Sequence, residues 1–365
     1  MKLLRHGVIA GLVVSATLAM AACGSDNQGG DNKPGAQAPS GDCATGTLNV
    51  QGSSAQKIAI EAWIAAYQAK CKGSTITYNA NGSGAGIEAF NASTADFAGS
   101  DSALKDDQLP GAKARCKSGA PVHLPMVIGP IAVVFNVEGV DKLQLKPATI
   151  AGIFSGKIAK WDDAAIKADN PTAKLPSAPI QAVHRSEDSG TTDNFTKYLG
   201  KTAPEVWTWP NAKKWPIDGG VGQKGSDGVA SAVKSTVNSI SYVELGFAET
   251  SGLKKAAVQN GAGEFVELTP DAASKTFANA TNKGTDTDIK LELDYKTAEK
   301  GAYPIVLATY EIVCSAGNGD KAALLKSFLT YTASTAGQAE LTKIGYAPLP
   351  ESVRGKVEAI AKSIA

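Results

Sequence analysis

The chain of 365 residues is predicted to form an α/β protein of two lobes. Its length exceeds what one hydrophobic core usually serves. Its first part alternates short apolar strands, glycine- or serine-rich turns and amphipathic helices, an order that gives parallel strands. Two long apolar runs interrupted by prolines, at 122–135 and 302–313, should each consist of two strands with a hinge between them. We expect them to carry the chain from the first lobe to the second and back, near 127–130 and 302–305.

Composition excludes several classes of protein. Hydrophobic residues make up 43% of the chain and charged residues 19%, as in ordinary globular proteins. The formal net charge of +1 provides no field for a nucleic-acid partner. The histidines, His6, His123 and His184, leave little material for a histidine-rich metal site. We therefore expect neither a metal nor a cofactor.

The N-terminal segment is predicted to be an export signal. Lys2 and Arg5 precede an apolar run that ends in small residues before Cys23, and this run is too short for a stable membrane span. The ending resembles a bacterial lipoprotein signal, so residues 1–22 would be removed and Cys23 lipidated. The polar stretch 23–42 would then be a flexible tether to the extracytoplasmic face of the cell membrane. The alternative is a plain cleaved signal with an incidental cysteine.

The remaining cysteines agree with export. Cys43, Cys71, Cys116 and Cys314 are an even number, suited to two disulfides in an oxidising compartment. Three pairings are possible. Cys43 precedes the first predicted strand and Cys71 ends the first predicted helix, which puts both at one end of a parallel unit. This position favours Cys43–Cys71, and hence Cys116–Cys314.

The folded body is predicted to begin with a repeated strand–turn–helix unit. A strand over 47–51 leads into a turn in which Ser53 or Ser54 should cap the next helix. One face of that helix carries Ile60, Trp63, Ile64 and Tyr67 at the i, i+3, i+4, i+7 spacing. A strand over 74–78, a glycine-rich turn over 81–86 and a helix from Ile87 repeat the pattern, and a short strand follows within 95–102. Ligands gather at the carboxyl ends of such parallel strands.

The stretch from His184 to Phe195 is the strongest candidate for an anion site. Ser189, Gly190 and Thr191 should lie at a helix N-terminus, where unpaired backbone N–H groups and the helix dipole favour an anion. Arg185 could add a forked pair of donors. The alternative is an ordinary capped helix. Since the turns near 52–54 and 81–84 have similar composition, three helix N-termini could meet on one anion.

One glycine motif is weak evidence for a dinucleotide site. Residues 220–225 match the G-x-G-x-x-G string of dinucleotide-binding proteins, but no strand is predicted before the first glycine. We interpret the string as a loop before a helix over 226–238. Helical sequence after Lys321 should complete the first lobe.

Several segments occur in an order that resembles the phosphate-binding lipoproteins of the bacterial high-affinity phosphate ABC transporter, the PstS family. They are 52–54, 81–84, 100–102, 153–161, 185–191, 225–229 and 240–244. The resemblance covers residues 47–350 and implies a two-lobed periplasmic-binding-protein fold of type II-like topology that closes by a hinge around its ligand. The two proline-marked runs predict lobe I over 43–127 and 304–365 and lobe II over 128–303. The resemblance implies no enzymatic activity. The implied partners are inorganic phosphate and a permease with its cytoplasmic ATPase.

Carried over residue by residue, the resemblance implies a set of phosphate-contacting positions: Ser54, Ala55, Ser83, Asp101, Arg185, Ser189, Gly190 and Thr191. Ala55 would contribute only its backbone, where relatives often have Phe. The segment around Cys116 resembles a small insertion relative to simpler relatives.

Asp101 is the residue expected to select the anion. A carboxylate beside an anion is unfavourable unless the anion brings a proton, which phosphate does near neutral pH and sulfate does not. Arg185, if paired with Asp101, would keep that carboxylate ionised. The alternatives are binding of sulfate or molybdate, a secreted phosphatase with His184 as its base, and a structural or adhesive surface lipoprotein.

Overall fold

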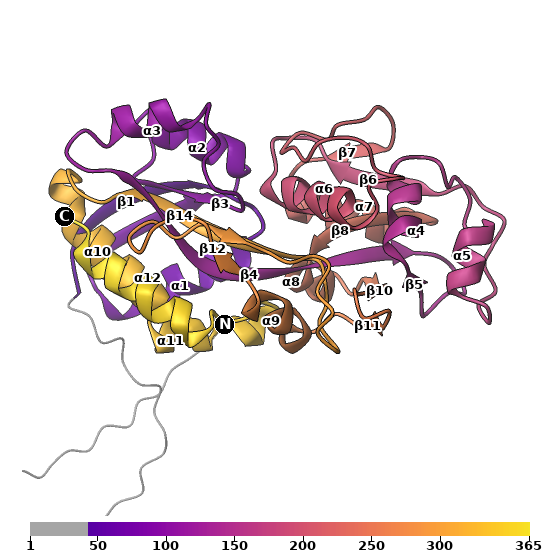
Figure 1. Ribbon diagram of the computed structural model, residues 1–365. Helices are drawn as coiled ribbons and strands as arrows, with labels where there is room; N and C mark the ends of the chain where they lie inside the picture. Colours follow the sequence, from indigo (N-terminus) through magenta and orange to yellow (C-terminus); the bar gives the residue numbers. More distant parts are fainter. Residues whose placement is uncertain (1–42) are drawn as a thin grey trace, which may run out of the picture. The chain divides into compact units, whose positions relative to one another are not determined.

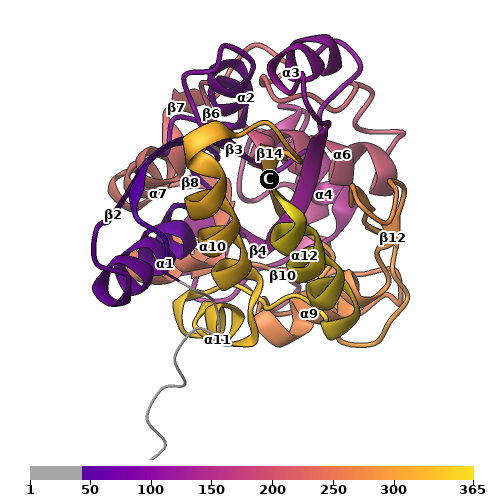
Figure 2. The same cartoon turned by 90° about the vertical axis from the view of Figure 1, so that its left-hand side faces the viewer.

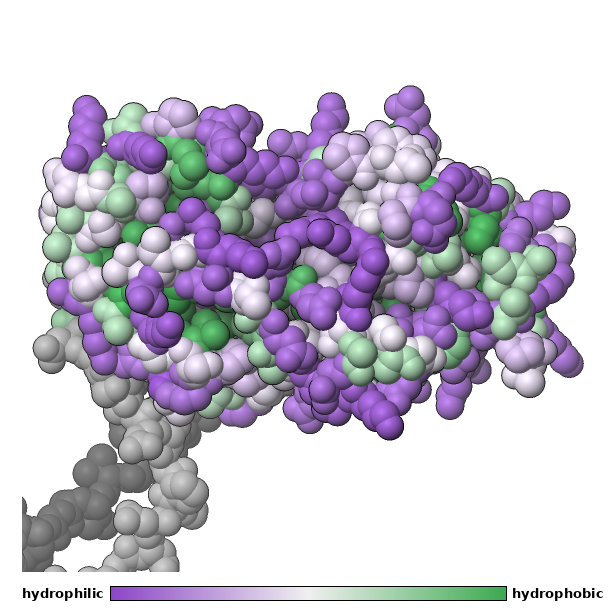
Figure 3. All heavy atoms as spheres, viewed as in Figure 1, coloured by the Kyte–Doolittle hydropathy of each residue, from purple (hydrophilic) through white to green (hydrophobic). Residues whose placement is uncertain are grey.

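The computed structural model describes residues 43–365. The predicted signal over 1–22, the tether over 23–42 and Cys23 lie outside these residues. Within the described part, no helix combines the length and apolar character needed to cross a membrane. Figure 3 shows hydrophilic side chains spread over the viewed face, with hydrophobic ones in small separate patches.

One mixed sheet of nine strands runs through the described residues, in the order β2-β1-β3-β14-β4-β8-β6-β7, with β9 also paired to β4 (Figure 1). The strands are β1 (Gly46–Gly52), β2 (Ser74–Asn79), β3 (Phe97–Ser100), β4 (Pro121–Asn136), β6 (Gln181–Arg185), β7 (Val221–Gln223), β8 (Ser239–Glu244), β9 (Lys254–Lys255) and β14 (Val306–Cys314). Two smaller sheets contain β5 (Gln144–Leu145), β10 (Ala257–Gln259) and β11 (Phe265–Val266), and β12 (Thr281–Asn282) with β13 (Leu291–Glu292). We call the half that contains β1–β3 and β14 lobe I, and the half that contains β6–β8 lobe II.

Strand β4 joins the two lobes. The prediction of two strands with a hinge between them was wrong here and also for 302–313, where the described residues form the single strand β14. The 16 residues of β4 form one strand that pairs first with β14 and then, from Ile131 onward, with β8. Pro125 lies next to a register shift in the pairing with β14, and Pro130 is the last residue paired with that strand. Both prolines thus occupy places where the ladder is irregular or changes partner, so the missing N–H is tolerated.

Helices cover lobe I on both sides of its parallel strands. They are α1 (Lys57–Lys70), α2 (Ser83–Asn91), α3 (Leu109–Arg115), α10 (Ala322–Ala333), α11 (Thr335–Ala339) and α12 (Glu351–Ser363), with short 3₁₀ turns η1 (Gly319–Lys321) and η2 (Leu341–Ile344). Figure 2 shows α10 and α12 lying side by side. The predicted apolar face of α1 is buried, and the indole of Trp63 donates to the backbone oxygen of Gly337 at 2.7 Å. Helix α10, which follows Lys321, packs against β1, α1 and α12.

Lobe II contains the remaining helices: α4 (Pro147–Phe154), α5 (Ala164–Asp169), α6 (Gly190–Thr202), α7 (Gly225–Ser235), α8 (Leu245–Thr250) and α9 (Pro270–Ala278). Its core contains an aromatic cluster in which the rings of Phe195 and Tyr242 stack with centroids 4.2 Å apart. The helix predicted over 226–238 ends at Ser235, earlier than expected. Asn238 has a positive φ of 63° and starts the turn into β8. An α-helix cannot continue through a residue in that conformation.

The predicted cap of the first helix was also wrong. The residue before α1 is Gln56, whose side chain makes no capping hydrogen bond. The hydroxyls of Ser53 and Ser54 bond instead to Asp101 and to Ser226. Serine side chains that find partners across the fold are not available to cap the adjacent helix.

The cysteine pairing predicted from sequence is confirmed. Cys43 pairs with Cys71 and Cys116 with Cys314, with Cα atoms 5.1 and 5.2 Å apart. The first disulfide fixes the start of β1 to the end of α1. The second ties the segment after α3 to the last residue of β14, so both stabilise lobe I.

Candidate functional site: an oxyanion site where the lobes meet

The N-terminus of α6 is the centre of the site. Ser189 is its N-cap and accepts a hydrogen bond from the backbone N–H of Thr192 at 3.2 Å, as the sequence predicts. Gly190 and Thr191 form the first turn, and all of these residues are buried. A helix N-terminus in this setting directs its N–H groups and positive dipole end at lobe I, where Gly190 lies against Asp101 and Ser83.

Arg185 ends strand β6 and is buried within the same site. Its Nε donates to Oε1 of Glu187 at 2.9 Å, and its Nη2 donates to the same oxygen. Its Nη1 faces the hydroxyls of Thr191 and Ser226 at 3.3 and 3.4 Å. Burial opposes ionisation of Glu187, but the charge and hydrogen bonds of Arg185 outweigh it and lower the pKa of that carboxyl. The expected pairing of Arg185 with Asp101 was wrong, because Glu187 takes that role.

Asp101 follows β3 in lobe I and faces lobe II. Its Oδ1 accepts hydroxyl hydrogen bonds from Ser53 at 2.6 Å and Thr309 at 2.7 Å, and its Oδ2 accepts one from Ser83 at 3.1 Å. Burial raises the pKa of Asp101 to about 6, and the hydrogen bonds from Ser53 and Thr309 oppose that rise. Among residues 43–365, hydroxyl groups hold this carboxyl and no cation is paired with it.

The start of α2 supplies a second helix N-terminus. Ser83 is the first residue of α2, and its Oγ accepts from the backbone N–H of Asp101 at 3.2 Å. The next residue, Gly84, donates its backbone N–H to the carbonyl of Asp188 in lobe II at 3.1 Å. A Cβ on Gly84 would lie 2.5 Å from the Cβ of Asp188, so only glycine permits this approach.

A third helix, α7, reaches the site from lobe II. Ser54 of lobe I lies 3.1 Å from Oγ of Ser226 and accepts the backbone N–H of Ser226 at 3.2 Å. The hydroxyl of Ser226 donates to Oε2 of Glu244 at 2.7 Å, and that of Thr191 donates to Oε1 of Glu244 at 2.6 Å. Glu244 is fully buried at the end of β8.

Ala55 is placed beside these groups but its backbone donor has a partner. Its N–H donates to Oγ of Ser53 at 3.0 Å. Its carbonyl accepts from the hydroxyl of Tyr346 at 2.6 Å. The structure therefore holds the 53–55 turn rigidly in place next to Asp101.

Polar contacts also join the lobes beside the site. Ser102 donates to Oδ2 of Asp193 at 2.6 Å, and Lys105 lies 3.4 Å from Oδ1 of the same residue. Asn194 donates to the backbone oxygen of Asp101 at 2.6 Å. Lys57 pairs with Asp227 at 2.7 Å elsewhere along the interface. A polar cavity of about 190 Å³ lies next to these contacts, with Asp101 in its wall.

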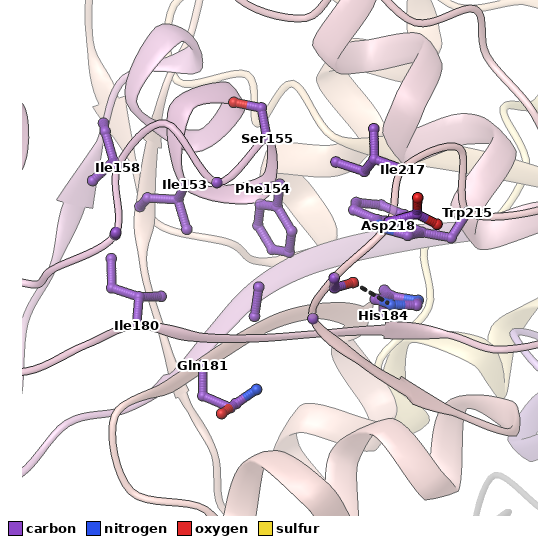
Figure 4. Close-up of a pocket in the computed structure, with 15 residues that line it drawn as sticks. Ile153, Phe154, Ser155, Ile158, Ile180, Gln181, His184, Trp215, Ile217 and Asp218 are labelled. Carbon is purple, nitrogen blue, oxygen red and sulfur yellow. Dashed lines mark hydrogen bonds between the residues drawn. The ribbon is translucent and has the colours of Figure 1, made fainter.

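His184 does not face the anion site. Its ring stacks on Trp215 with centroids 4.9 Å apart, and its ring nitrogens lie 2.9 and 3.1 Å from the carbonyl oxygens of Arg185 and Gly219. Figure 4 shows it in the wall of a separate pocket of about 190 Å³, beside Trp215 and Phe154. In the part of the chain that the structure describes, no group of three or more His, Cys, Asp or Glu side chains could hold a metal ion.

The structure brings all eight sequence-predicted positions to this region and adds five residues that sequence reasoning missed: Ser53, Glu187, Ser226, Glu244 and Thr309. The sequence contained a signal for Glu244. This residue ends β8, Arg185 ends β6, and the two strands are parallel neighbours. Residues at adjacent carboxyl ends are expected to meet. Thr309 gave no such signal, since it lies inside an antiparallel strand.

Two lobes that meet on buried hydroxyls, helix N-termini and an arginine define a solute-binding protein of the hinge-closing class, with a site suited to a small oxyanion. A family model described as the PBP superfamily domain matches residues 37–336. Phosphate-binding protein PstS 3 of Mycobacterium leprae is 41% identical over 372 residues, which is 100% of both chains. Phosphate-binding protein PstS 3 of Mycobacterium tuberculosis is 39% identical over 373 residues, again 100% of both. The chain therefore belongs to the PstS family of phosphate-binding proteins.

Solved structures agree on the fold. A putative phosphate ABC transporter substrate-binding protein with bound phosphate from Clostridium perfringens aligns with a TM-score of 0.62 and 19% identity, over 84% of this chain and 100% of that one. A phosphate-binding protein from Stenotrophomonas maltophilia aligns with a TM-score of 0.65 and 19% identity, over 86% and 94%. At this identity the likeness concerns the two-lobed architecture.

Proposed function

We propose that this chain captures inorganic phosphate between its two lobes outside the cytoplasm and delivers it to the permease of an ABC transporter. The observation that carries the proposal is Asp101, a buried carboxylate that lies among hydroxyls and against the first turn of α6. Such a site attracts an anion yet repels one without a proton. Phosphate keeps a proton near neutral pH, whereas sulfate and molybdate do not.

The proposed ligand set is the one that the family resemblance implies. Ser54, Ala55, Ser83 and Asp101 would approach the anion from lobe I. Arg185, Ser189, Gly190 and Thr191 would approach it from lobe II, with backbone N–H groups of the first turn of α6 as donors. An enclosed phosphate loses its water, so each oxygen needs a replacement partner. Charged hydrogen bonds contribute roughly 1.5–3 kcal/mol each, enough for micromolar binding or better after the cost of closure.

Closure would take place where the lobes join. We propose lobe I over 43–127 and 304–365 and lobe II over 128–303, with bending near the point where β4 changes partner from β14 to β8. Phosphate would stabilise the closed state because it binds groups from both lobes at once.

Anchoring and delivery complete the proposal. Cys23 would carry the lipid and the stretch 23–42 would tether the lobes to the outer face of the membrane. A permease and its ATPase would accept phosphate when the lobes open. We propose binding without catalysis, since His184 faces backbone carbonyls and Trp215 rather than the anion site.

Calorimetric titration of the purified protein with phosphate, sulfate and molybdate tests the proposal. Phosphate should bind with micromolar or tighter affinity and the other two far more weakly. Equal affinity for sulfate would identify a general oxyanion-binding protein. Release of the alcohol from a chromogenic phosphate ester would identify a phosphatase, and absence of any binding heat would favour a structural role.

A further inference from the structure

Glu244 gives the site a second buried carboxylate, opposite Asp101. A carboxylate only accepts hydrogen bonds, and a serine or threonine hydroxyl has a single proton. Thr191 donates its proton to Oε1 of Glu244 at 2.6 Å, and Ser226 donates its proton to Oε2 at 2.7 Å. Neither hydroxyl therefore keeps a proton for an anion between the lobes. Within the described residues, Ser226 also accepts from Ser54 and from Nη1 of Arg185, which uses both of its lone pairs. Thr191 accepts from Nη1 of Arg185 and keeps one lone pair.

The hydroxyls around Asp101 also donate their protons to a carboxylate. Ser53, Ser83 and Thr309 all donate to its carboxyl oxygens. Ser189 differs, because its Oγ accepts from the N–H of Thr192 and so keeps its own proton for the anion. The site is thus divided into donors at the start of α6 and acceptors at two separate places, one in each lobe.

The charges of the site also favour a ligand that carries protons. Arg185 is paired with Glu187, which leaves Asp101 and Glu244 as two further carboxyl groups. Three ionisable groups of the described residues face Glu244. Arg185 bonds to the same two hydroxyls as Glu244, and Asp101 and Tyr346 face it from lobe I. The negative charge of Glu244 raises the pKa of both Asp101 and Tyr346, after burial as the main cause. A ligand with less negative charge is favoured here.

We propose that Glu244 is a specificity-determining residue that makes the closed site prefer dihydrogen phosphate, H₂PO₄⁻, over HPO₄²⁻. One ligand O–H would donate to Asp101 in lobe I, and the second to the remaining lone pair of Thr191 in lobe II. HPO₄²⁻ can satisfy only one of these acceptors, and sulfate neither. Glu244 acts through the two hydroxyls, so it is a positioning residue. The inference rests on the proposed phosphate-binding function.

The preference has a measurable consequence above neutral pH, where dissolved phosphate is mostly HPO₄²⁻. Binding must then take one proton from the buffer for each phosphate, and affinity should fall about tenfold per pH unit. Calorimetry of the wild-type protein at about pH 8.5, in buffers with different ionisation enthalpies, counts that proton through linkage. An uptake close to one supports the proposal, and an uptake close to zero overturns it.

Glu244→Gln should remove most of this uptake. The amide can accept from one hydroxyl and donate to the other, which frees a hydroxyl proton for the anion, so HPO₄²⁻ becomes an adequate ligand. Asp169→Asn is the matched control, because Asp169 is likewise buried in lobe II and accepts from the hydroxyl of Thr149 at 2.7 Å. It should keep the wild-type uptake.

Different outcomes test the role of Glu244, the preference for H₂PO₄⁻ and phosphate binding itself. Uptake that persists in the Glu244→Gln protein, or that disappears equally in Asp169→Asn, overturns the role of Glu244. If Glu244→Gln does not fold, the wild-type proton count still decides whether H₂PO₄⁻ is preferred. Absence of phosphate binding at every pH would instead contradict the proposed function itself.

Discussion

Gly190 of α6 lies against Asp101 of the other lobe so closely that a Cβ added to the glycine would be 2.5 Å from the Cβ of Asp101. The same added atom would be 2.5 Å from Oγ of Ser83. The first turn of α6 can thus approach the carboxylate only because residue 190 has no side chain. The contact links the helix N-terminus to the residue expected to recognise the anion.

Gly190→Ala should therefore weaken phosphate binding by separating the lobes. Overpacking of this kind costs about 1–3 kcal/mol, or about five- to 150-fold in affinity. Calorimetry measures the change. Gly200→Ala in the same helix is the control, because its added Cβ would lie 3.8 Å from Trp207, an ordinary contact. Equal affinities of the two variants would show that the close approach is not needed for binding.

Asp101→Asn should increase sulfate affinity far more than it changes phosphate affinity. The amide can donate to a bare oxygen, whereas the carboxylate presents lone pairs to it. Buried mismatches of this kind can discriminate by factors of about 10⁴–10⁵. Both dissociation constants should be measured at one pH. If their ratio remains that of the wild type, Asp101 is not the selectivity element.

Ser102→Ala should speed phosphate release without touching the ligand. The variant removes the 2.6 Å hydrogen bond to Asp193 that joins the lobes beside the site. A hydrogen bond contributes about 1 kcal/mol net, so the dissociation rate should rise about fivefold. Stopped-flow tryptophan fluorescence gives that rate. Ser235→Ala, whose serine bonds only within α7, should leave it unchanged. An unchanged rate in Ser102→Ala would show that this contact does not hold the closed state.

Glu311→Gln should remove a pH dependence of stability. The carboxyl oxygens of Glu311 are buried without a well-formed hydrogen bond within the described residues, and burial, opposed by a weak contact with Gln56, raises its pKa to about 8. Because the folded pKa is raised, the native state binds more protons than the unfolded state between about pH 4.5 and about 8, and stability falls as pH rises through that window. The advantage of the variant should grow by at most about 1.4 kcal/mol per pH unit there. Urea unfolding at the two ends of the window measures it, and a constant difference would contradict the prediction.

Removing the disulfide Cys116–Cys314 should destabilise the protein more than removing Cys43–Cys71. The bridged cysteines are 198 and 28 residues apart, and a longer closed loop loses more entropy in the unfolded chain. The chain-entropy model gives about 5 and about 3.6 kcal/mol, respectively. Double alanine variants compared by urea unfolding test the order. Equal losses would indicate that loop length does not dominate.

Local sequence determined the parts of the fold that depend on near neighbours. The apolar face of α1 follows from the helical spacing of Ile60, Trp63, Ile64 and Tyr67. Ser189 caps α6 because its hydroxyl reaches an N–H three residues away. The disulfide Cys43–Cys71 could be predicted because both cysteines flank one strand–helix unit. In each case the deciding contact lies within a short stretch of chain.

Partners far apart in sequence were decided only by the tertiary structure. Thr309 and Asp101 are 208 residues apart, and Ser54 and Ser226 are 172 apart. A polar side chain bonds to whichever group is buried beside it, and that depends on strand order and register, which spacing does not encode. Arg185 is different, because its partner Glu187 lies only two residues further along the chain. The sequence alone thus determined which residue types gather at the site, and packing of the two lobes decided which of them hold one another.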